Sequence, residues 1–283
     1  MNDKSKITSM RKGFQISYAS IIGAVFSFAL IVGAIMMGTR NYLSFLSIEG
    51  FMIVGGGTLA VAFMSYQANY VIEALKGIGL MFMKADVTHE NLNRDMINIL
   101  EWARIVRIKG LRALEFEVED TGIKDPFVRY GLDMVVSNYT PEEVRSMMET
   151  AADAYFERDT TAARVLMSMA SHAPAFGMVG TLVGMVIMLG NFKGDIAGIG
   201  TGLSISLLAT LYGVVTARMI YMPSAAKIFQ KQEDLRFRNY LITEGMVLLV
   251  DNRSHRYVQD RLNSFLKPGL QKKISAAGLE TLI

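Results

Sequence analysis

Two threonines in apolar segments are the residues of this chain best suited to chemistry. Each lies in a stripe of small residues at helical spacing: Gly177, Gly180, Thr181 and Gly184 in the first, and Gly202, Ser206, Thr210, Gly213 and Ala217 in the second. A hydroxyl offers a neutral acceptor to a partly dehydrated cation, but it cannot carry a proton at physiological pH. Thr181 and Thr210 could therefore face one polar pathway in which another group bears the charge.

Helix packing is the alternative interpretation of both stripes. In lipid, small residues let helices approach closely, and hydroxyls hydrogen-bond across the contact or to their own backbone. What favours a pathway is the pairing of one threonine in each of two adjacent segments that are joined by a short turn.

The two segments that carry these threonines contain no carboxylate. Residues 165–192 and 196–217 lack Asp, Glu, Lys and Arg, and their one histidine is His172, near the start of the first. At a segment end, we expect His172 to hydrogen-bond at the membrane interface rather than to relay protons. Ion-driven machines place an ionisable group inside the membrane because it marks the ion path. If ions cross here, the carboxylate must come from another chain.

Four segments without charged residues predict an all-α integral membrane protein with four transmembrane helices. They are residues 13–39, 50–72, 165–192 and 196–217, and roughly 20 apolar residues suffice to cross a bilayer. Hydrophobic residues make up 51% of the 283 residues, which is more than an ordinary water-soluble domain contains. The first segment is too long for the apolar region of a signal peptide, so we expect it in the mature protein.

The distribution of positive charges predicts the orientation in the membrane. Lys and Arg number four before the first segment, one between the first and second, twelve between the second and third, one between the third and fourth, and eleven after the fourth. The positive-inside rule then places both termini in the cytoplasm. The predicted cytoplasmic parts are the N-terminus 1–12, a large helical domain 73–164, a helix 218–266 and a C-terminal tail 267–283. Short outer turns would cover 41–47 and 193–195.

Composition excludes several classes of protein. The net charge of +3 does not indicate nucleic-acid binding, because the positive charges follow the membrane topology instead of forming one patch. With no cysteine and three scattered histidines, we expect no disulfide, no metal site and no cofactor. No catalytic Ser/His/Asp grouping, phosphate loop or carboxylate pair is evident, so we expect no enzyme. A membrane-bound enzyme or scaffold whose loop carries an activity is the alternative from a different class.

Local signals predict helices in the soluble parts. Thr140, Pro141 and Glu143 form a helix start with a capping box, from which a helix should run into the third span. Residues 91–119 and 225–266 have apolar positions at helical spacing. Asp125 and Pro126 should break the chain between the helices of the large domain.

Several sequence runs resemble the MotA/PomA family of flagellar motor stator A subunits, within the MotA/TolQ/ExbB superfamily. They are PAFGMVGTLVG at 174–184, LLATLYG at 207–213, Met222-Pro223, and DPFVRYGL at 125–132. The similarity extends over nearly the whole chain, including four spans, loop size and order. It implies a subunit that converts ion flow into torque in the bacterial inner membrane.

The resemblance also implies partners. Five copies of this chain would surround two copies of a MotB/PomB-type protein, whose transmembrane helix brings an Asp and whose periplasmic domain grips peptidoglycan. Passage of H⁺ or Na⁺ past that Asp would rotate the pentamer against a rotor of FliG-type subunits. Threonine at both positions is similar to sodium-type members, but some proton-type members carry hydroxyls there, so the ion stays open.

Residue roles follow from the same resemblance. Thr181 and Thr210 match the ion-path threonines, and Pro174 and Pro223 match the prolines tied to conformational coupling. Arg107 and Glu115 match a charged pair that contacts the rotor; on one helix they would lie about 80° apart around the axis. The alternatives are a helix kink without a gating role for the prolines and an ordinary solvated face for the charges.

A TolQ/ExbB-like energy-transducing proton channel subunit is the other candidate within this superfamily. Such subunits have three spans and an outer N-terminus. The four apolar segments and the basic N-terminal cluster of Lys4, Lys6, Arg11 and Lys12 argue against it.

Overall fold

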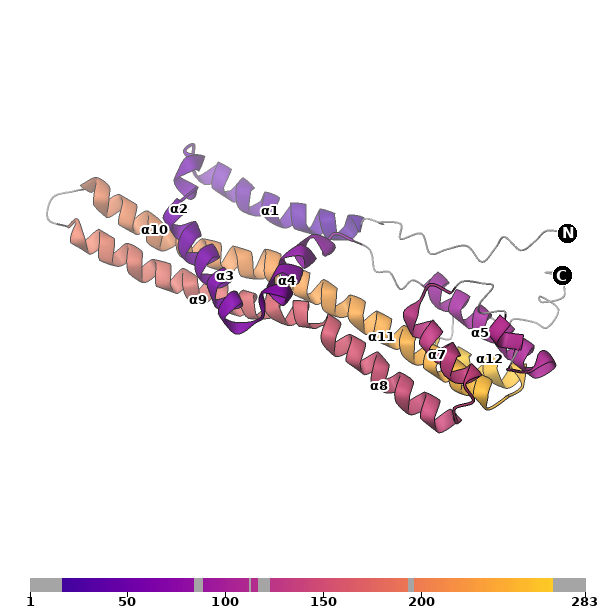
Figure 1. Cartoon of the computed structure of the whole chain (residues 1–283). Helices are drawn as coiled ribbons and strands as arrows, with labels where there is room; N and C mark the ends of the chain where they lie inside the picture. The colour runs from indigo at the N-terminus through magenta and orange to yellow at the C-terminus, as the bar shows by residue number, and fades with distance from the viewer. Residues whose placement is uncertain (1–16, 84–88, 112, 117–122, 193–195, 267–283) are drawn as a thin grey trace. The chain divides into compact units, whose positions relative to one another are not determined.

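Helices make up the regular structure of this chain wherever it is described. The structure, a computed structural model, describes residues 17–83, 89–111, 113–116, 123–192 and 196–266 (Figure 1). The described residues contain no β-strand, in agreement with the predicted all-α class. The predicted N-terminus 1–12, outer turn 193–195 and tail 267–283 lie outside these residues. The described residues divide into two units, a first within 89–156 and 233–266, and a second within 17–83 and 157–232.

The second unit contains the apolar helices. In chain order these are α1 (Tyr18–Gly38), a 3₁₀ turn (Tyr42–Phe45), α2 (Ile48–Phe51), a π turn (Met52–Gly56), α3 (Gly57–Ser65), α4 (Ala68–Leu80), α9 (Thr161–Gly190), α10 (Ile196–Val215), a second π turn (Thr216–Tyr221) and the first part of α11 (Met222–Val250). Four stretches are long and apolar enough to cross a membrane. The prediction of four transmembrane helices is therefore confirmed.

The second apolar segment is divided, although the sequence predicts one span over 50–72. Its helical series ends at Ser65, Tyr66 is extended with φ −133° and ψ 156°, and α4 begins at Ala68 as a separate helix. α4 is amphipathic: Val71 and Ala74 are buried against the α9 side of the unit, while Glu73 and Lys76 occupy the same helix. A helix with two charges on its exposed side belongs outside the lipid, so the span ends before it.

The third and fourth spans continue into long helices. α8 (Pro141–Asp159) is followed by Thr160, whose φ of −83° and ψ of −9° stay helical, and α9 begins at the next residue. The predicted helix from Thr140 into the third span is thus interrupted only at this residue. Likewise, helical structure continues past residue 217, the predicted end of the fourth span, because the π turn Thr216–Tyr221 leads directly from α10 into α11.

The first unit consists of α5 (His89–Lys109), α7 (Pro126–Val136), most of α8, the rest of α11 and α12 (His255–Asn263). These helices enclose one apolar core, in which Leu132, Met148, Leu241 and Leu262 are fully buried. The predicted capping box is confirmed: Thr140 N–H donates to Glu143 Oε2 at 2.9 Å, and Glu143 N–H donates to Thr140 Oγ1 at 3.3 Å.

The C-terminal helical pattern is two helices instead of one. α11 ends at Val250, Asn252 adopts a left-handed φ of 51°, and Ser254 caps α12 by accepting from Tyr257 N–H at 3.3 Å. A residue with positive φ cannot continue a right-handed helix, so the chain reverses there. Apolar spacing alone did not reveal this turn.

Candidate ion pathway and rotor-facing residues

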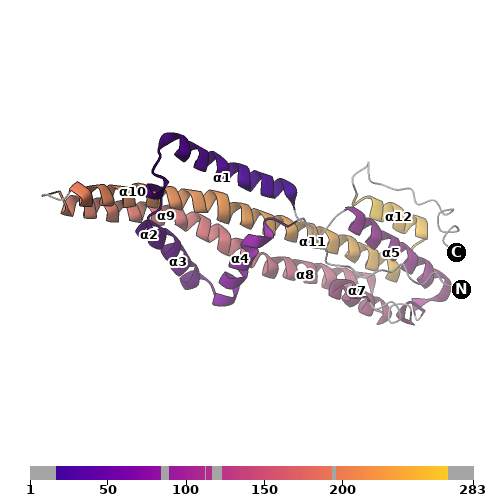
Figure 2. The same ribbon diagram turned by 90° about the horizontal axis from the view of Figure 1, so that it is seen from above.

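The two small-residue stripes bring the backbones of α9 and α10 into contact. A Cβ atom placed on Gly184 would lie 2.5 Å from the carbonyl oxygen of Gly202, and one placed on Gly213 would lie 2.6 Å from the carbonyl oxygen of Ala173. Distances this short leave no room for any side chain. Both views show the two helices side by side along this contact (Figures 1 and 2). The glycines of the two stripes therefore have the packing role given by the alternative interpretation.

The threonine hydroxyls meet where the two stripes face each other. Thr181 Oγ1 and Thr210 Oγ1 are 2.6 Å apart, within hydrogen-bond distance. Thr210 is exposed and Thr181 is half-buried, so the pair lies at the surface of the α9 and α10 hairpin and not inside its packed seam. The two oxygens thus form a neutral polar site on the surface of this chain, where a group from another molecule can reach it.

Ser206 completes this polar group, although the sequence analysis assigned it only to the stripe. Its Oγ donates to the Thr181 carbonyl oxygen at 3.1 Å, and Thr181 Oγ1 lies 3.3 Å from the Ser206 carbonyl oxygen. Thr181 Oγ1 also reaches the Gly177 carbonyl oxygen at 3.0 Å. Three hydroxyls and three carbonyls therefore gather between the helices, with only three protons to donate. Such oxygen-rich sets suit water or a hard monovalent cation.

Tyr212 joins α10 to the residues at the start of the second span. Its phenol donates to the Phe45 carbonyl oxygen at 2.6 Å and accepts from Ser47 N–H at 2.9 Å. A Cβ atom on Gly50 would lie 3.4 Å from the Tyr212 ring, so the start of the span packs on the same side chain. The bonding partners are more than 160 residues apart in the chain, which is why no local pattern indicated them.

The two prolines lie in continuous helix. Pro174 is inside α9 and removes the donor that would satisfy the Ala170 carbonyl oxygen; its Cα would lie 3.2 Å from a Cβ atom on Gly213. Pro223 follows the π turn Thr216–Tyr221. A proline ring collides with the carbonyl four residues before it in a regular helix, and a π turn displaces that carbonyl. Pro174 thus interrupts the hydrogen-bond ladder at the α9 and α10 contact, and Pro223 interrupts it at the start of α11.

Arg107 and Glu115 are both exposed, but they do not share one helix. α5 ends at Lys109, and Gly110 has a left-handed φ of 83° while its N–H donates to the Val106 carbonyl oxygen at 2.9 Å. Helical structure resumes at residue 111 and continues to 116, apart from the undescribed residue 112. The predicted angle of 80° between the two side chains is therefore wrong, because a helix-terminating glycine lies between them.

Comparisons with known proteins identify the relatives of this chain. Residues 119–238 match the model of the MotA/TolQ/ExbB proton channel family. The chain is 31% identical to chemotaxis protein PomA of Vibrio alginolyticus over 89% of this chain and 96% of that protein. It is 29% identical to motility protein A of Treponema pallidum, over 90% and 96% respectively. The chain belongs to the MotA/PomA family.

A solved structure agrees with this membership. The described fold is similar to C. jejuni MotAB with a TM-score of 0.80 and 25% identity, covering 92% of this chain and 100% of that chain. The predicted family is confirmed, and the relatives over most of the length include PomA and motility A proteins, which does not favour the TolQ/ExbB alternative. As a family member with four apolar spans, the chain is a multi-pass protein of the bacterial inner membrane. The MotA/PomA family comprises stator channel subunits and not enzymes.

The first unit of this MotA/PomA protein is held by a buried arginine that the sequence analysis missed. Arg238 Nε donates to Asp95 Oδ2 at 2.5 Å, and its Nη1 donates to Asp125 Oδ2 at 2.6 Å. Asp125 also caps α7, accepting from Phe127 N–H at 2.9 Å through its other oxygen. Burial opposes the charge of Arg238, but the two aspartates outweigh that effect and raise its pKa. One guanidinium thus joins α5, α7 and α11.

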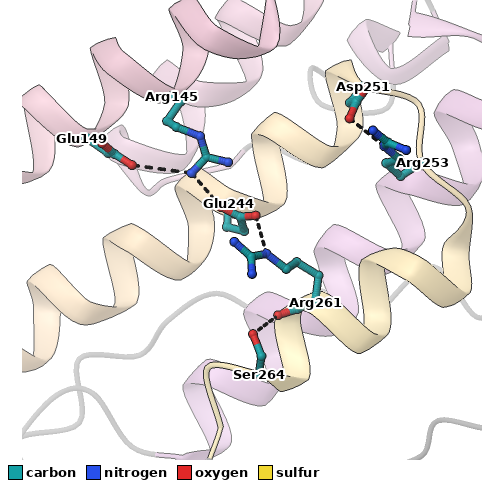
Figure 3. A network of polar contacts seen from close by, with 7 residues as sticks. All are labelled: Arg145, Glu149, Glu244, Asp251, Arg253, Arg261 and Ser264. Atoms are coloured by element: carbon teal, nitrogen blue, oxygen red, sulfur yellow. Dashed lines mark hydrogen bonds and ion pairs between the residues drawn. The ribbon is translucent and has the colours of Figure 1, made fainter.

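A second charged group in the same unit centres on Glu244 (Figure 3). Its side chain is 6% exposed, and it accepts from Arg145 at 2.8 Å and from Arg261 at 2.7 Å. Burial alone would raise the pKa of Glu244, but hydrogen bonds and charges from the two arginines lower it below its ordinary value. The network links α8, α11 and α12. Together with Arg238, it fixes the helices that carry the exposed charges of this unit.

Proposed function

We propose that this chain is the A-type stator subunit of a bacterial flagellar motor, which converts ion flow into torque. The observation that carries the proposal is the exposed hydroxyl pair of Thr181 and Thr210 on charge-free spans of a MotA/PomA family member. The pair offers oxygen ligands along a helix surface while lacking any group that could hold a proton. We expect no enzymatic activity.

A second protein supplies the missing carboxylate in this proposal. The similar structure is that of a MotAB complex, so a MotB/PomB-type subunit is the partner proposed here, with an Asp on its transmembrane helix. Two such helices would lie within a homopentamer of this chain, each Asp facing hydroxyl pairs of the ring. The translocated H⁺ or Na⁺ is the only ligand of this path, and no cofactor is needed.

The remaining proposed roles concern coupling and the rotor. Pro174 interrupts the backbone ladder of the helix that carries Thr181, and Pro223 interrupts it where the helix that carries Thr210 passes into α11, so both prolines are proposed to transmit ion binding to the helices. Both termini and the first unit would face the cytoplasm, where exposed Arg107 and Glu115 would contact a FliG-type rotor protein. Exposed charges of both signs suit a contact that forms and releases quickly.

Removing single hydroxyls tests the ion-path assignment. Thr181→Val and Thr210→Val nearly keep the side-chain shape, so each should abolish most swimming while the complex with the partner still assembles. The matched control is Thr201→Val, because Thr201 also lies on α10 and is exposed, and its hydroxyl donates within its own helix to the Ala197 carbonyl oxygen at 3.1 Å. Soft-agar swimming and copurification of the partner are the measurements. Normal swimming of both Thr181→Val and Thr210→Val would refute the assignment.

Ion identity is tested separately. Swimming speed is measured against external sodium, with and without a protonophore, in cells that carry this chain and its partner as their only stator. A speed that follows sodium and resists the protonophore indicates a sodium path, and the opposite result indicates a proton path.

A further inference from the structure

A cavity in the second unit lies away from the hydroxyl pair. It encloses about 470 Å³ between the first half of α1 and the junction of α10 with α11. Figures 1 and 2 both show α1 running alongside this junction. The volume of the cavity falls within the range of roughly 300–1,000 Å³ that is typical of small-molecule sites. The stator proposal assigns no role to most of its lining.

The α1 wall of the cavity is small and weakly polar. Ser20, Gly23, Ala24 and Ser27 line it at intervals of three and four residues, which places them on one face of the helix. A Cβ atom on Gly23 would meet no other atom within 4 Å, so this wall is recessed and open. The start of α1 is held in place by Ser17 N–H, which donates to the Phe82 carbonyl oxygen at 2.8 Å.

The opposite wall carries two cations next to apolar groups. Arg218 and Lys227 line the cavity together with Met219, Pro223 and Ala226, and Gln230 lies at its end. Arg218 Nη1 lies 3.5 Å from the Met222 sulfur, a weak acceptor. Neither cation forms an ion pair with a carboxylate among the residues that the structure describes, and no acidic residue lines the cavity.

The sequence positions of the lining residues indicate where the cavity lies relative to the membrane. Arg218 is the first charge after the charge-free run 196–217, and Ser20 lies in the first turn of α1. The cavity is therefore at the membrane boundary, and the apolar side chains of Met219 and Ala226 line it beside the cations. Basic pockets between transmembrane helices at such a boundary bind anionic lipid headgroups.

We propose that the groove between α1 and the α10–α11 junction binds an anionic phospholipid. The phosphate lies between Arg218 and Lys227, whose charges have no carboxylate partner within the described part of the chain, and an acyl chain follows the recessed face of Gly23 and Ala24. A free phosphate would pair with the two cations but would leave the recessed α1 wall and the apolar side chains of Met219 and Ala226 uncovered. Because Pro223 lines the same cavity, the bound lipid contacts the junction at which α10 passes into α11.

Native mass spectrometry of the purified complex of this chain with its partner subunit tests the proposal. The complex is mixed with detergent-solubilised phosphatidylglycerol or phosphatidylcholine, and retained lipid is counted. We expect preferential retention of phosphatidylglycerol. Arg218→Gln with Lys227→Gln should weaken it about 25-fold, at about fivefold per basic residue near a membrane surface. Lys76→Gln, which removes an exposed charge of the same unit outside the cavity, should leave retention unchanged.

A second pair of variants tests the groove with both cations intact. Gly23→Leu fills the recessed α1 wall and should cause loss of phosphatidylglycerol retention, whereas Gly33→Leu, at another open position of α1, should not. Size-exclusion chromatography verifies that each variant assembles.

Four results would overturn the proposal. The first is equal retention of the two lipids, and the second is unchanged phosphatidylglycerol retention by Gly23→Leu. The third is complete displacement of phosphatidylglycerol by excess inorganic phosphate. The fourth is a complex that retains no phosphatidylglycerol, which is expected if a second copy of this chain fills the cavity. The inference needs only the membrane placement of α1 and α10, so its failure would leave the proposed stator function intact.

Discussion

The contact between α9 and α10 and the core of the first unit hold helices together by opposite means. The α9 and α10 contact uses backbone approach at Gly184 and Gly213 and neutral hydroxyls. The first unit uses large apolar side chains and the buried guanidinium of Arg238. In lipid, moving an apolar side chain from the lipid into a helix contact gives no hydrophobic stabilisation. Helices there associate through close backbone packing and hydrogen bonds between hydroxyls. In water, apolar burial drives association and a buried charge is tolerable once it is fully paired.

Removal of the buried guanidinium should have the largest effect on stability. Arg238→Met leaves Asp95 and Asp125, whose side chains are only 14% and 16% exposed, without their cation, which should cost about 3 kcal/mol of unfolding free energy. The control Arg253→Met breaks an exposed pair with Asp251, worth at most about 1 kcal/mol. Thermal unfolding of the purified complexes, followed by limited proteolysis of the first unit, measures both. Equal midpoints would mean that the apolar core alone holds this unit.

A methyl group at the backbone contact should have the next largest effect. Gly184→Ala places a carbon 2.5 Å from two backbone atoms of α10, so the helices must separate, at a cost of about 1–3 kcal/mol. Gly190→Ala lies on the same helix with nothing within 4 Å and should be neutral or slightly stabilising. Thermal midpoints of the two complexes are compared. If both variants unfold alike, the spans are not held by backbone approach.

Acid should weaken the Glu244 network by a smaller amount. The folded pKa of Glu244 is lowered, so its stabilising contribution is present above the ordinary glutamate pKa and is lost as the pH falls through the folded value. We expect Glu244→Gln to cost about 1 kcal/mol at pH 7, because Arg145 and Arg261 are partly exposed. The difference from the unsubstituted chain should persist down to the ordinary glutamate pKa of 4.5 and shrink as the pH falls below it. Unfolding midpoints between pH 7 and 3 measure this, with Glu101→Gln, at an exposed residue of α5, as the control.

The exposed charges of the first unit should matter least for stability. Arg107→Glu combined with Glu115→Lys should change the unfolding free energy by less than about 0.5 kcal/mol, because both side chains are solvated. In the motor, the same variant should reduce torque measured on tethered cells while ion leak stays unchanged. An unaltered motor would show that these charges form only a solvated face.

Local patterns predicted the four spans, the facing small-residue stripes and the capping box at Thr140, because each depends on residues within a few turns of one another. They did not predict Arg238 with Asp95 or Tyr212 with Phe45, whose partners lie 143 and 167 residues apart. They also missed the helix end at Gly110. A glycine between apolar positions is compatible with a continuing helix and with a left-handed terminator, and only the packing around it decides which forms.

The backbone contact between α9 and α10 limits how this hairpin can move. Neither helix can slide or rotate against the other without driving carbonyls into Cα atoms, so Thr181 and Thr210 keep their separation when the protein changes shape. Displacement must then be absorbed at the ends of the hairpin, where the ladder is already irregular at Thr216–Tyr221. The hydroxyl site therefore moves as a rigid body with the two helices. A conformational change would alter which groups the site faces, while the distance between its two oxygens stays constant.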